Sequence, residues 1–331
     1  MGLNQSSEEP PKTLPIRCAN QSSEVLKTLS IRCAHCNAVF TPEKLDYGAV
    51  TSRFTLELLR DAFVRLGRDA ETNEFLLRSH RRGEAENRAL SEKCTVLRAS
   101  GMSLTDANAT LGRSAMHVFS LRQADALLEL CGEDLGKMWF LDVGAGTGEV
   151  TESLARHFRK TCATESSRGM ARRLRKRGFS VVLQSDSIDT VVEDVRSLPG
   201  GEDLAADGFD VVAALNLCDR VSTPVTLMAQ LKRALKPGTG ILILAIVVPF
   251  RPFVEGEDGA RIKPAEVVLN TPSTGTWEAG VEALWENLIR PAGFDLVALS
   301  RVPYISEGDH NFAAYTLDDA VFVLRPSRLK S

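Results

Sequence analysis

The chain has 331 residues, of which 44% are hydrophobic and 25% charged, and its formal net charge is −3. This length suffices for one domain of about 200 residues and an additional segment. The small negative charge provides no general attraction to nucleic acid or anionic membranes, so we expect neither as a partner. The seven cysteines are scattered and no apolar run is long enough to cross a bilayer, which predicts an intracellular, cytoplasmic protein without stable membrane insertion.

The first 50 residues differ in composition from the remainder. A polar unit at 4–19 is nearly repeated at 20–34, which we interpret as a tandem duplication in a poorly ordered tail that adds little to the core. Gly2 fits a myristoylation pattern, and one myristate would give only weak, reversible membrane association. Cys33 and Cys36 have ligand-like spacing, but no second pair follows at a suitable distance, so we expect no metal site.

A helical pattern follows this segment. From residue 51 to about 111, apolar residues recur at spacings of three and four, which predicts helices. We assign residues 51–120 to a helical cap. Ser120 is then the expected N-cap of a helix over 121–131, at the start of the main domain, 121–328.

Strands and helices alternate along this main domain. Such alternation predicts an α/β fold with a doubly wound, mostly parallel sheet of seven strands, the last two of which pair antiparallel because no helix signal separates them. Sites in such sheets lie beyond the carboxyl ends of the strands, so Gly144, Glu165, Asn216 and Phe250 are expected to converge. The predicted strands are 137–143, 160–165, 179–184, 209–216, 240–248, 294–302 and 319–324; the predicted helices between them are 148–158, 167–177, 223–235 and 276–290.

A glycine-rich turn follows the first of these strands and indicates a nucleoside cofactor. Gly144, Gly146 and Gly148 allow a sharp turn close to a ligand before a helix begins. A dinucleotide-binding turn would have glycine where Glu149 stands, and a carboxylate there repels pyrophosphate. Asp142 and Glu149 make the turn acidic, which favours a cofactor with a sulfonium and an ammonium group, namely S-adenosylmethionine.

Glu165 ends the second strand of this domain, 21 positions after Gly144. An acid at this place in a nucleotide-binding fold accepts hydrogen bonds from the ribose hydroxyls, so we predict that Glu165 binds the ribose. The alternative is a chance pattern, since glycine-rich turns followed by an acid occur in many α/β proteins.

Further polar residues lie at the predicted rim of the sheet. Asn216 is a candidate to bind the amino-acid end of the cofactor, and Asp219 is a candidate to orient a nucleophile. Alternatively, both residues form a turn and cap the following helix. Tyr304 and Tyr315 are candidates to position a substrate nitrogen or the cofactor carboxylate, or else they cap a sheet edge.

Six blocks of the sequence resemble the DREV family, also known as methyltransferase-like protein 9. The resemblance implies the Rossmann-like class I methyltransferase fold and methylation of histidine in proteins at the pros nitrogen, in motifs where two histidines flank one small residue. The chain departs from the family at His117, where phenylalanine is usual, and in an insertion at 185–207, which affects substrate choice most. The blocks are 112–120, 141–150, 163–165, 215–220, 249–255 and 317–324.

The resemblance also implies roles for single residues. Asp219 and Tyr315 face the substrate imidazole, and Asp219 fixes its tautomer. Two other functions stay open: methylation of a small metabolite or another side chain on the same fold, and a catalytically silent binding module. The residues implied in cofactor binding are Asp142, Gly144, Glu165, Asn216 and Tyr304.

Overall fold

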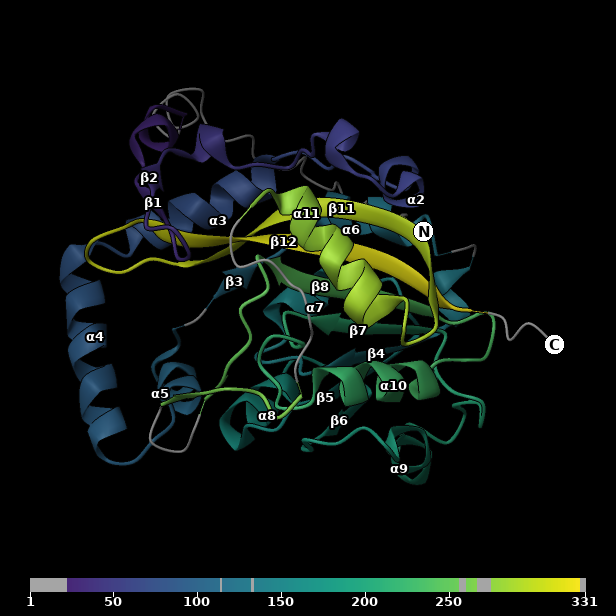
Figure 1. The fold of residues 1–331 in the computed structure, drawn as a ribbon. Coiled ribbons are helices and arrows are strands. Elements are labelled where there is room, and N and C mark those ends of the chain that lie inside the picture. Colours follow the sequence, from purple (N-terminus) through teal and green to yellow (C-terminus); the bar gives the residue numbers. More distant parts are fainter. Residues whose placement is uncertain (1–22, 114, 132–133, 256–259, 267–274, 328–331) are drawn as a thin grey trace, which may run out of the picture.

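The computed structural model describes residues 23–113, 115–131, 134–255, 260–266 and 275–327. Five parallel strands form the centre of its main sheet, in the order β8-β7-β4-β5-β6 (Figure 1). Helices cover both faces of this sheet, so its strands are apolar runs; all eight residues of β8 are buried. The strands are β4 (Trp139–Val143), β5 (Lys160–Thr164), β6 (Val181–Leu183), β7 (Val211–Leu215) and β8 (Ile241–Val248).

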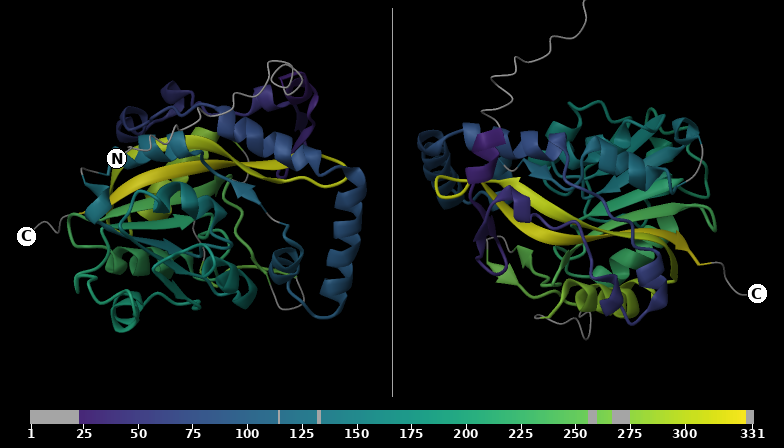
Figure 2. Two further views of the ribbon diagram at one scale, coloured as in Figure 1. Left: turned by 180° about the vertical axis from the view of Figure 1, so that it is seen from behind. Right: turned by 90° about the horizontal axis from the view of Figure 1, so that it is seen from above.

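Two long antiparallel strands complete the predicted set. β11 (Phe294–Glu307) pairs with β12 (Ala314–Pro326), and β12 lies antiparallel beside β8. Figure 2 shows this pair curving past one side of the parallel strands and projecting beyond them. All seven strands expected from the sequence are therefore present, and the doubly wound α/β fold is confirmed.

The main sheet contains ten strands among the described residues, so the expected count of seven is wrong. The three additional strands are short: β1 (Ile31–Cys33), β2 (Val39–Phe40) and β3 (Met116–His117). β1 lies parallel to β12 and pairs antiparallel with β2, whereas β3 pairs with β11. Strands of two or three residues carry too little alternation to be recognised in a sequence.

The prediction of a poorly ordered tail is wrong for residues 23–50. Ile31 is fully buried and Leu29 nearly so, and both pack with Phe75 and Leu76 in a small third core. Residues 23–28 are helical. The apolar residues of the second repeat are therefore buried against helix residues of the cap. The first copy of the repeat and Gly2 lie outside the described residues.

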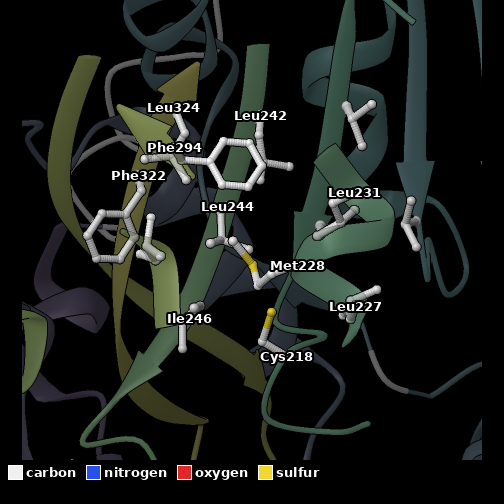
Figure 3. Packing of buried hydrophobic residues seen from close by; sticks show 14 of the residues in the cluster. Cys218, Leu227, Met228, Leu231, Leu242, Leu244, Ile246, Phe294, Phe322 and Leu324 are labelled. Carbon is white, nitrogen blue, oxygen red and sulfur yellow. The ribbon is translucent and has the colours of Figure 1, made fainter. Parts of the chain in front are cut away.

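Helices pack against both faces of the sheet. α6 (Leu121–Leu128) and α7 (Glu149–Ala155) contribute to the core on one face. On the other face lie α10 (Pro224–Ala234) and α11 (Trp277–Leu284), which continues as a π-helix over Trp285–Ile289. Figure 3 shows Met228 and Leu231 of α10 against Leu242 and Leu244 of β8. Ser120 caps α6 as expected, in a capping box with Gln123.

The predicted cap region is helical. Its helices are α2 (Glu57–Asp61), α3 (Ala70–Arg81), α4 (Glu84–Ala99) and α5 (Leu104–Leu111). α4 extends away from the sheet at one end of the molecule, and α5 returns to pack on α8 (Arg168–Leu174) (Figure 1). The inserted region contains α9 (Val191–Ser197), whose valines join the core. Because β1 and β3 enter the main sheet, the domain boundaries at residues 50 and 120 stay predictions. No helix within the described ranges is long and apolar enough to cross a membrane.

Candidate functional site

The glycine-rich turn connects β4 to α7 in the conformation that its sequence requires. Gly144 and Gly148 have φ of 71° and 81°, in the left-handed region that favours glycine. A Cβ atom on Gly144 would lie 2.8 Å from Leu217 Cδ1, and one on Gly148 would lie 2.7 Å from Leu174 Cδ2. The Gly144 N–H donates to the Thr164 carbonyl at 3.0 Å. The turn is therefore held tightly between β5 and the segment after β7.

Asp142 lies beneath this turn and is buried. Its Oδ2 accepts a hydrogen bond of 2.5 Å from the Thr151 hydroxyl, whereas its Oδ1 has no hydrogen-bond partner in the described part of the chain. Burial, with a smaller contribution from the charge of Glu165, raises the pKa of the Asp142 carboxyl to about 7, although the Thr151 hydrogen bond opposes this shift. An additional donor or a nearby positive charge would stabilise this carboxylate.

Glu165 is buried at the end of β5, as predicted, and faces the turn. Its Oε2 accepts from the Gly146 N–H at 2.8 Å and its Oε1 from the Ser167 N–H at 2.7 Å. Oε1 also accepts from the Ser166 hydroxyl at 3.5 Å, whereas Oε2 retains a lone pair that can accept a further donor such as a ribose hydroxyl. Ser167 caps α8, and its hydroxyl donates to Asp106 of α5 at 2.5 Å. Sequence reasoning missed Asp106, which connects the cap to Glu165.

Asn216 follows β7 in the left-handed conformation, with φ of 56°. Its side-chain amide donates to both carboxyl oxygens of Asp319, at 2.9 and 2.8 Å. Asp319 lies on β12 and is fully buried; burial raises its pKa well above the usual range, and the Asn216 hydrogen bond opposes this shift. Asp319 is not among the site residues predicted from the sequence, although it directly precedes an apolar run, 320–324, in which a carboxyl is prone to be buried.

Asp219 lies close to this pair and is also buried. Its Oδ2 accepts from Arg220 Nη1 at 2.5 Å, and its Oδ1 lacks a hydrogen-bond partner among the described residues. Burial raises the pKa of Asp219 to about 6 despite the opposing charge of Arg220. The Arg220 guanidinium lies over the Phe253 ring at 4.2 Å, and the Phe253 N–H donates to the Asp219 carbonyl at 3.0 Å.

These contacts argue against the alternative that Asn216 and Asp219 cap the next helix. The N-cap residue of α10 is Thr223, and it has no side-chain capping bond. Asn216 and Asp219 are instead engaged with Asp319 and Arg220. Of the predicted apolar segment after β8, Phe253 contacts Asp219 and Arg220, whereas Phe250 is buried in the core on the α10 face.

The two candidate tyrosines have different positions. Tyr304 lies near Asp219 and Asp319. Burial, and to a smaller extent the charges of these two carboxyls, raises the pKa of the Tyr304 hydroxyl. This hydroxyl contacts the Met116 sulfur at 2.6 Å. Tyr315 lies four residues along β12 from Asp319, about 13 Å at the usual strand rise. Its hydroxyl donates to Asp309 at 2.7 Å. The substrate contact expected for Tyr315 stays a prediction.

A cavity of about 750 Å³ adjoins the site between α3, β3 and α7. Met116 lines this cavity and also contacts the Tyr304 hydroxyl. Charged side chains of both signs surround it, among them Arg78, Glu149 and Glu307. Within the described ranges, no group of three or more His, Cys, Asp or Glu residues is arranged to hold a metal ion.

A nucleoside-type glycine turn, a buried acid beneath it and an acid at the next strand end define a Rossmann-like methyltransferase site. The chain belongs to the DREV methyltransferase family, whose model matches residues 50–326. This membership confirms the class I methyltransferase fold and S-adenosylmethionine as the cofactor.

Curated and solved proteins of the same class are similar to the chain at low identity. The ubiquinone biosynthesis O-methyltransferase of Hahella chejuensis is 26% identical over 152 residues, and the match spans 46% of this chain but only 57% of that relative. An S-adenosylmethionine-dependent methyltransferase structure from Clostridium acetobutylicum is 14% identical with a TM-score of 0.39, covering 63% of this chain and 93% of that one. The CurJ carbon methyltransferase is 14% identical with a TM-score of 0.47, covering 80% and 73%.

Proposed function

We propose that the protein transfers a methyl group from S-adenosylmethionine to the pros nitrogen of histidine in proteins or peptides, within motifs where two histidines flank one small residue. The observation that carries this proposal is Asp219 Oδ1, a buried carboxylate oxygen without a hydrogen-bond partner among the described residues, beside Tyr304 and Asp319 at the rim of the sheet. A ring N–H is a suitable donor for such an oxygen.

The residues around the turn fit the cofactor. Asp142 Oδ1 lacks a partner in the described part of the chain, and the carboxyls of Asp142 and Glu165 favour a cation over a phosphate group. Gly144 and Gly146 let the backbone approach a ligand closely, and Glu165 Oε2 retains a free lone pair for a hydroxyl donor. When bound, S-adenosylmethionine supplies an electrophilic methyl group. Asp142, Gly144, Gly146 and Glu165 would hold it.

Asp219 orients the acceptor in this proposal. Neutral imidazole, with an ordinary pKa of about 6.5, is already nucleophilic at neutral pH, so orientation matters more than a strong base. The Asp219 carboxyl, whose pKa is about 6, is mostly ionised at pH 7 and accepts a hydrogen bond from the tele N–H. This contact leaves the lone pair on the pros nitrogen and stabilises the positive charge that the ring acquires. Such orientation can lower the activation free energy of methyl transfer by several kcal/mol.

The neighbouring cavity supports a peptide as the acceptor. With about 750 Å³ and charged side chains of both signs, it offers room and polar partners for residues that flank the methylated histidine. Met116 connects the cavity to the Tyr304 hydroxyl and thus to the side of the site where Asp219 lies.

The test of the acceptor role is an Asp219→Ala variant. We expect methyl transfer to a His-Ala-His peptide to fall by about a hundredfold or more, because the ring loses its orienting acceptor. Calorimetry should show unchanged affinity for S-adenosylhomocysteine. Asp318→Asn is the matched control. Asp318 precedes Asp319 in the chain, but its carboxylate is part-exposed and pairs with Arg301. Full activity of Asp219→Ala would reject the assignment.

The test of the cofactor site is a Glu165→Ala variant. It should lose most of its affinity for S-adenosylhomocysteine in calorimetry, because the ribose loses its acceptor. Unchanged affinity would contradict the role of Glu165. A wild-type protein that binds no cofactor at all would favour the catalytically silent binding module.

A second candidate function is methylation of a small molecule. It is favoured by the similarity to a protein named as a ubiquinone biosynthesis O-methyltransferase. Incubation with labelled S-adenosylmethionine distinguishes the two candidates. Label on the His-Ala-His peptide supports the protein substrate, whereas label on phenolic small molecules but not on the peptide supports the alternative.

A further inference from the structure

The loop between β1 and β2 brings two cysteines together. Cys33 is the last residue of β1, and Cys36 lies in the turn that follows. The Cys33 N–H donates to the Ala38 carbonyl at 2.8 Å, and the Asn37 N–H donates to the Cys33 carbonyl at 3.0 Å. The bond from Asn37 to Cys33 closes a single helical turn, in which residues three apart have Cβ atoms about 5–6 Å apart, so a small adjustment brings the two cysteines to the span of a disulfide. Each thiol influences the pKa of the other.

The turn is fixed to the main sheet before any reaction occurs. Cys33 is in register with Thr316 of β12, and the Ala34 N–H donates to the Thr316 carbonyl at 2.9 Å. Asn37 adopts the left-handed conformation, with φ of 62°, which reverses the chain toward β2. The backbone therefore holds both cysteines in place, and a bond between them requires little further ordering.

The two thiols differ in reactivity. Cys36 is exposed. The Ala38 backbone N–H, with a contribution from Cys33, lowers the pKa of the Cys36 thiol, although partial burial and the charge of Asp318 oppose this shift. Cys33 is half-buried, and burial raises its pKa. Thiolate is the attacking form of cysteine, so Cys36 is the residue that reacts first.

Four other described cysteines lack this reactivity. All four are buried, and burial raises the pKa of the Cys131 and Cys162 thiols to about 12. They are Cys94, Cys131, Cys162 and Cys218.

We propose that Cys33 and Cys36 form a redox-active dithiol that low-molecular-weight disulfides, of which glutathione disulfide is the type, convert reversibly to an intramolecular disulfide. The Cys36 thiolate attacks one sulfur of glutathione disulfide; its S–S bond breaks, a mixed disulfide forms at Cys36, and one glutathione thiolate leaves. The Cys33 thiol then loses its proton and attacks Cys36 Sγ, which releases the second glutathione. The two cysteines lose two electrons and two protons, and glutathione disulfide becomes two glutathione molecules. This chemistry depends on the hairpin alone and not on the proposed histidine methylation.

Mass spectrometry of the full-length protein tests the proposal. The protein is equilibrated with glutathione and glutathione disulfide at ratios from reducing to oxidising, its free thiols are alkylated, and it is digested with trypsin. Cleavage after Arg32 and Lys44 puts both cysteines in one peptide, 33–44. We expect this peptide to lose two hydrogen atoms as the buffer becomes oxidising and to regain them on reduction. Recovery of the peptide with both thiols alkylated at every ratio would overturn the proposal.

Single variants test the order of the two steps. Cys33→Ser should retain glutathione on Cys36, because the second attack is impossible. Cys36→Ser should carry much less glutathione on Cys33 under the same conditions. Equal modification of the two variants, or more on Cys33, would refute the assignment of Cys36 as the attacking thiol.

The chain contains its own matched control. Cys18 has the same preceding residues as Cys33, Ile-Arg, and the same following alanine, but no cysteine two residues beyond that alanine. Cys18 lies in a different tryptic peptide, 18–27, so its pairing with Cys33 or Cys36 would link two peptides. An oxidised 33–44 peptide without such links supports the proposed pair, whereas linked peptides as the main product would refute it.

Discussion

Replacement of Asn216 tests the pairing that lies at the centre of the site. Asn216→Ala removes both hydrogen bonds to the buried Asp319 carboxyl, and a buried polar group left without partners costs about 1–3 kcal/mol. Alanine must also adopt a φ of 56°, which adds about 1 kcal/mol because its Cβ crowds the following carbonyl. We therefore expect Asn216→Ala to lower the free energy of unfolding by about 3 kcal/mol.

A glycine at the same position separates these two contributions. Asn216→Gly loses the hydrogen bonds but not the backbone preference, so it should be about 1 kcal/mol more stable than Asn216→Ala. Urea denaturation of the cofactor-free protein measures both differences. Asn37 is the control, since it also has a positive φ, of 62°, but its exposed side chain accepts a hydrogen bond from Arg32 instead of pairing with a buried carboxyl. Asn37→Ala should cost the backbone contribution of about 1 kcal/mol alone.

A double variant identifies Asp319 as the partner. Asn216→Gly with Asp319→Ala should be more stable than Asn216→Gly alone, because no buried carboxyl is then left unpaired. Equal stability of Asn216→Ala and Asn216→Gly would refute the backbone argument. If Asn216→Gly lowered stability equally with and without Asp319, the hydrogen-bond argument would fail.

Two further variants test contacts of the cap and its neighbour β3. Asp106→Leu should weaken S-adenosylhomocysteine binding about fivefold in calorimetry, because the Ser167 hydroxyl loses the acceptor that helps to hold Ser167 against Glu165. Asp106→Asn keeps an acceptor for this hydroxyl, so its affinity should stay near that of the wild type. An equal loss of affinity in both variants would contradict this reasoning. Burial lowers the pKa of His117 to about 4, so wild-type stability should fall relative to His117→Phe by up to about 3 kcal/mol as pH drops from about 6.5 to about 4. Urea unfolding at several pH values measures the difference, and parallel curves would rule out the buried neutral histidine.

The parts of the fold that could be predicted from the sequence are those with local signals. The parallel strands are buried on both faces and are therefore apolar runs, and β8 was recognised for this reason. The glycine turn and Glu165 were found because their spacing along the chain follows from one strand, one turn and one helix. β1 was missed because its three residues lie in a polar repeat, and only burial against α3 and β12 makes them a strand.

Contacts between distant segments explain what the sequence left open at the site. Asn216 was a candidate from its position after β7, but its partner Asp319 is 103 residues away. Asp106 is 61 residues from Ser167, and its local pattern with Ser103 indicates the start of a helix but not this contact. Both contacts place a residue of one segment against a strand or helix end of another, which no local pattern specifies.

The cofactor turn and the surroundings of Asp219 are built from different parts of the chain. The cofactor turn depends mainly on contiguous residues after β4 and β5, so its affinity for a cofactor can be predicted from the sequence. The surroundings of Asp219 combine the segment after β7 with β11 and β12, and the charge of Asp219 raises the pKa of both Asp319 and Tyr304. Replacement of Asp219 by a neutral residue should therefore lower the pKa of Asp319 and Tyr304. In the proposed function, substrate choice depends on this arrangement of three segments rather than on a single motif, so the acceptor is best identified by assay on the full-length protein.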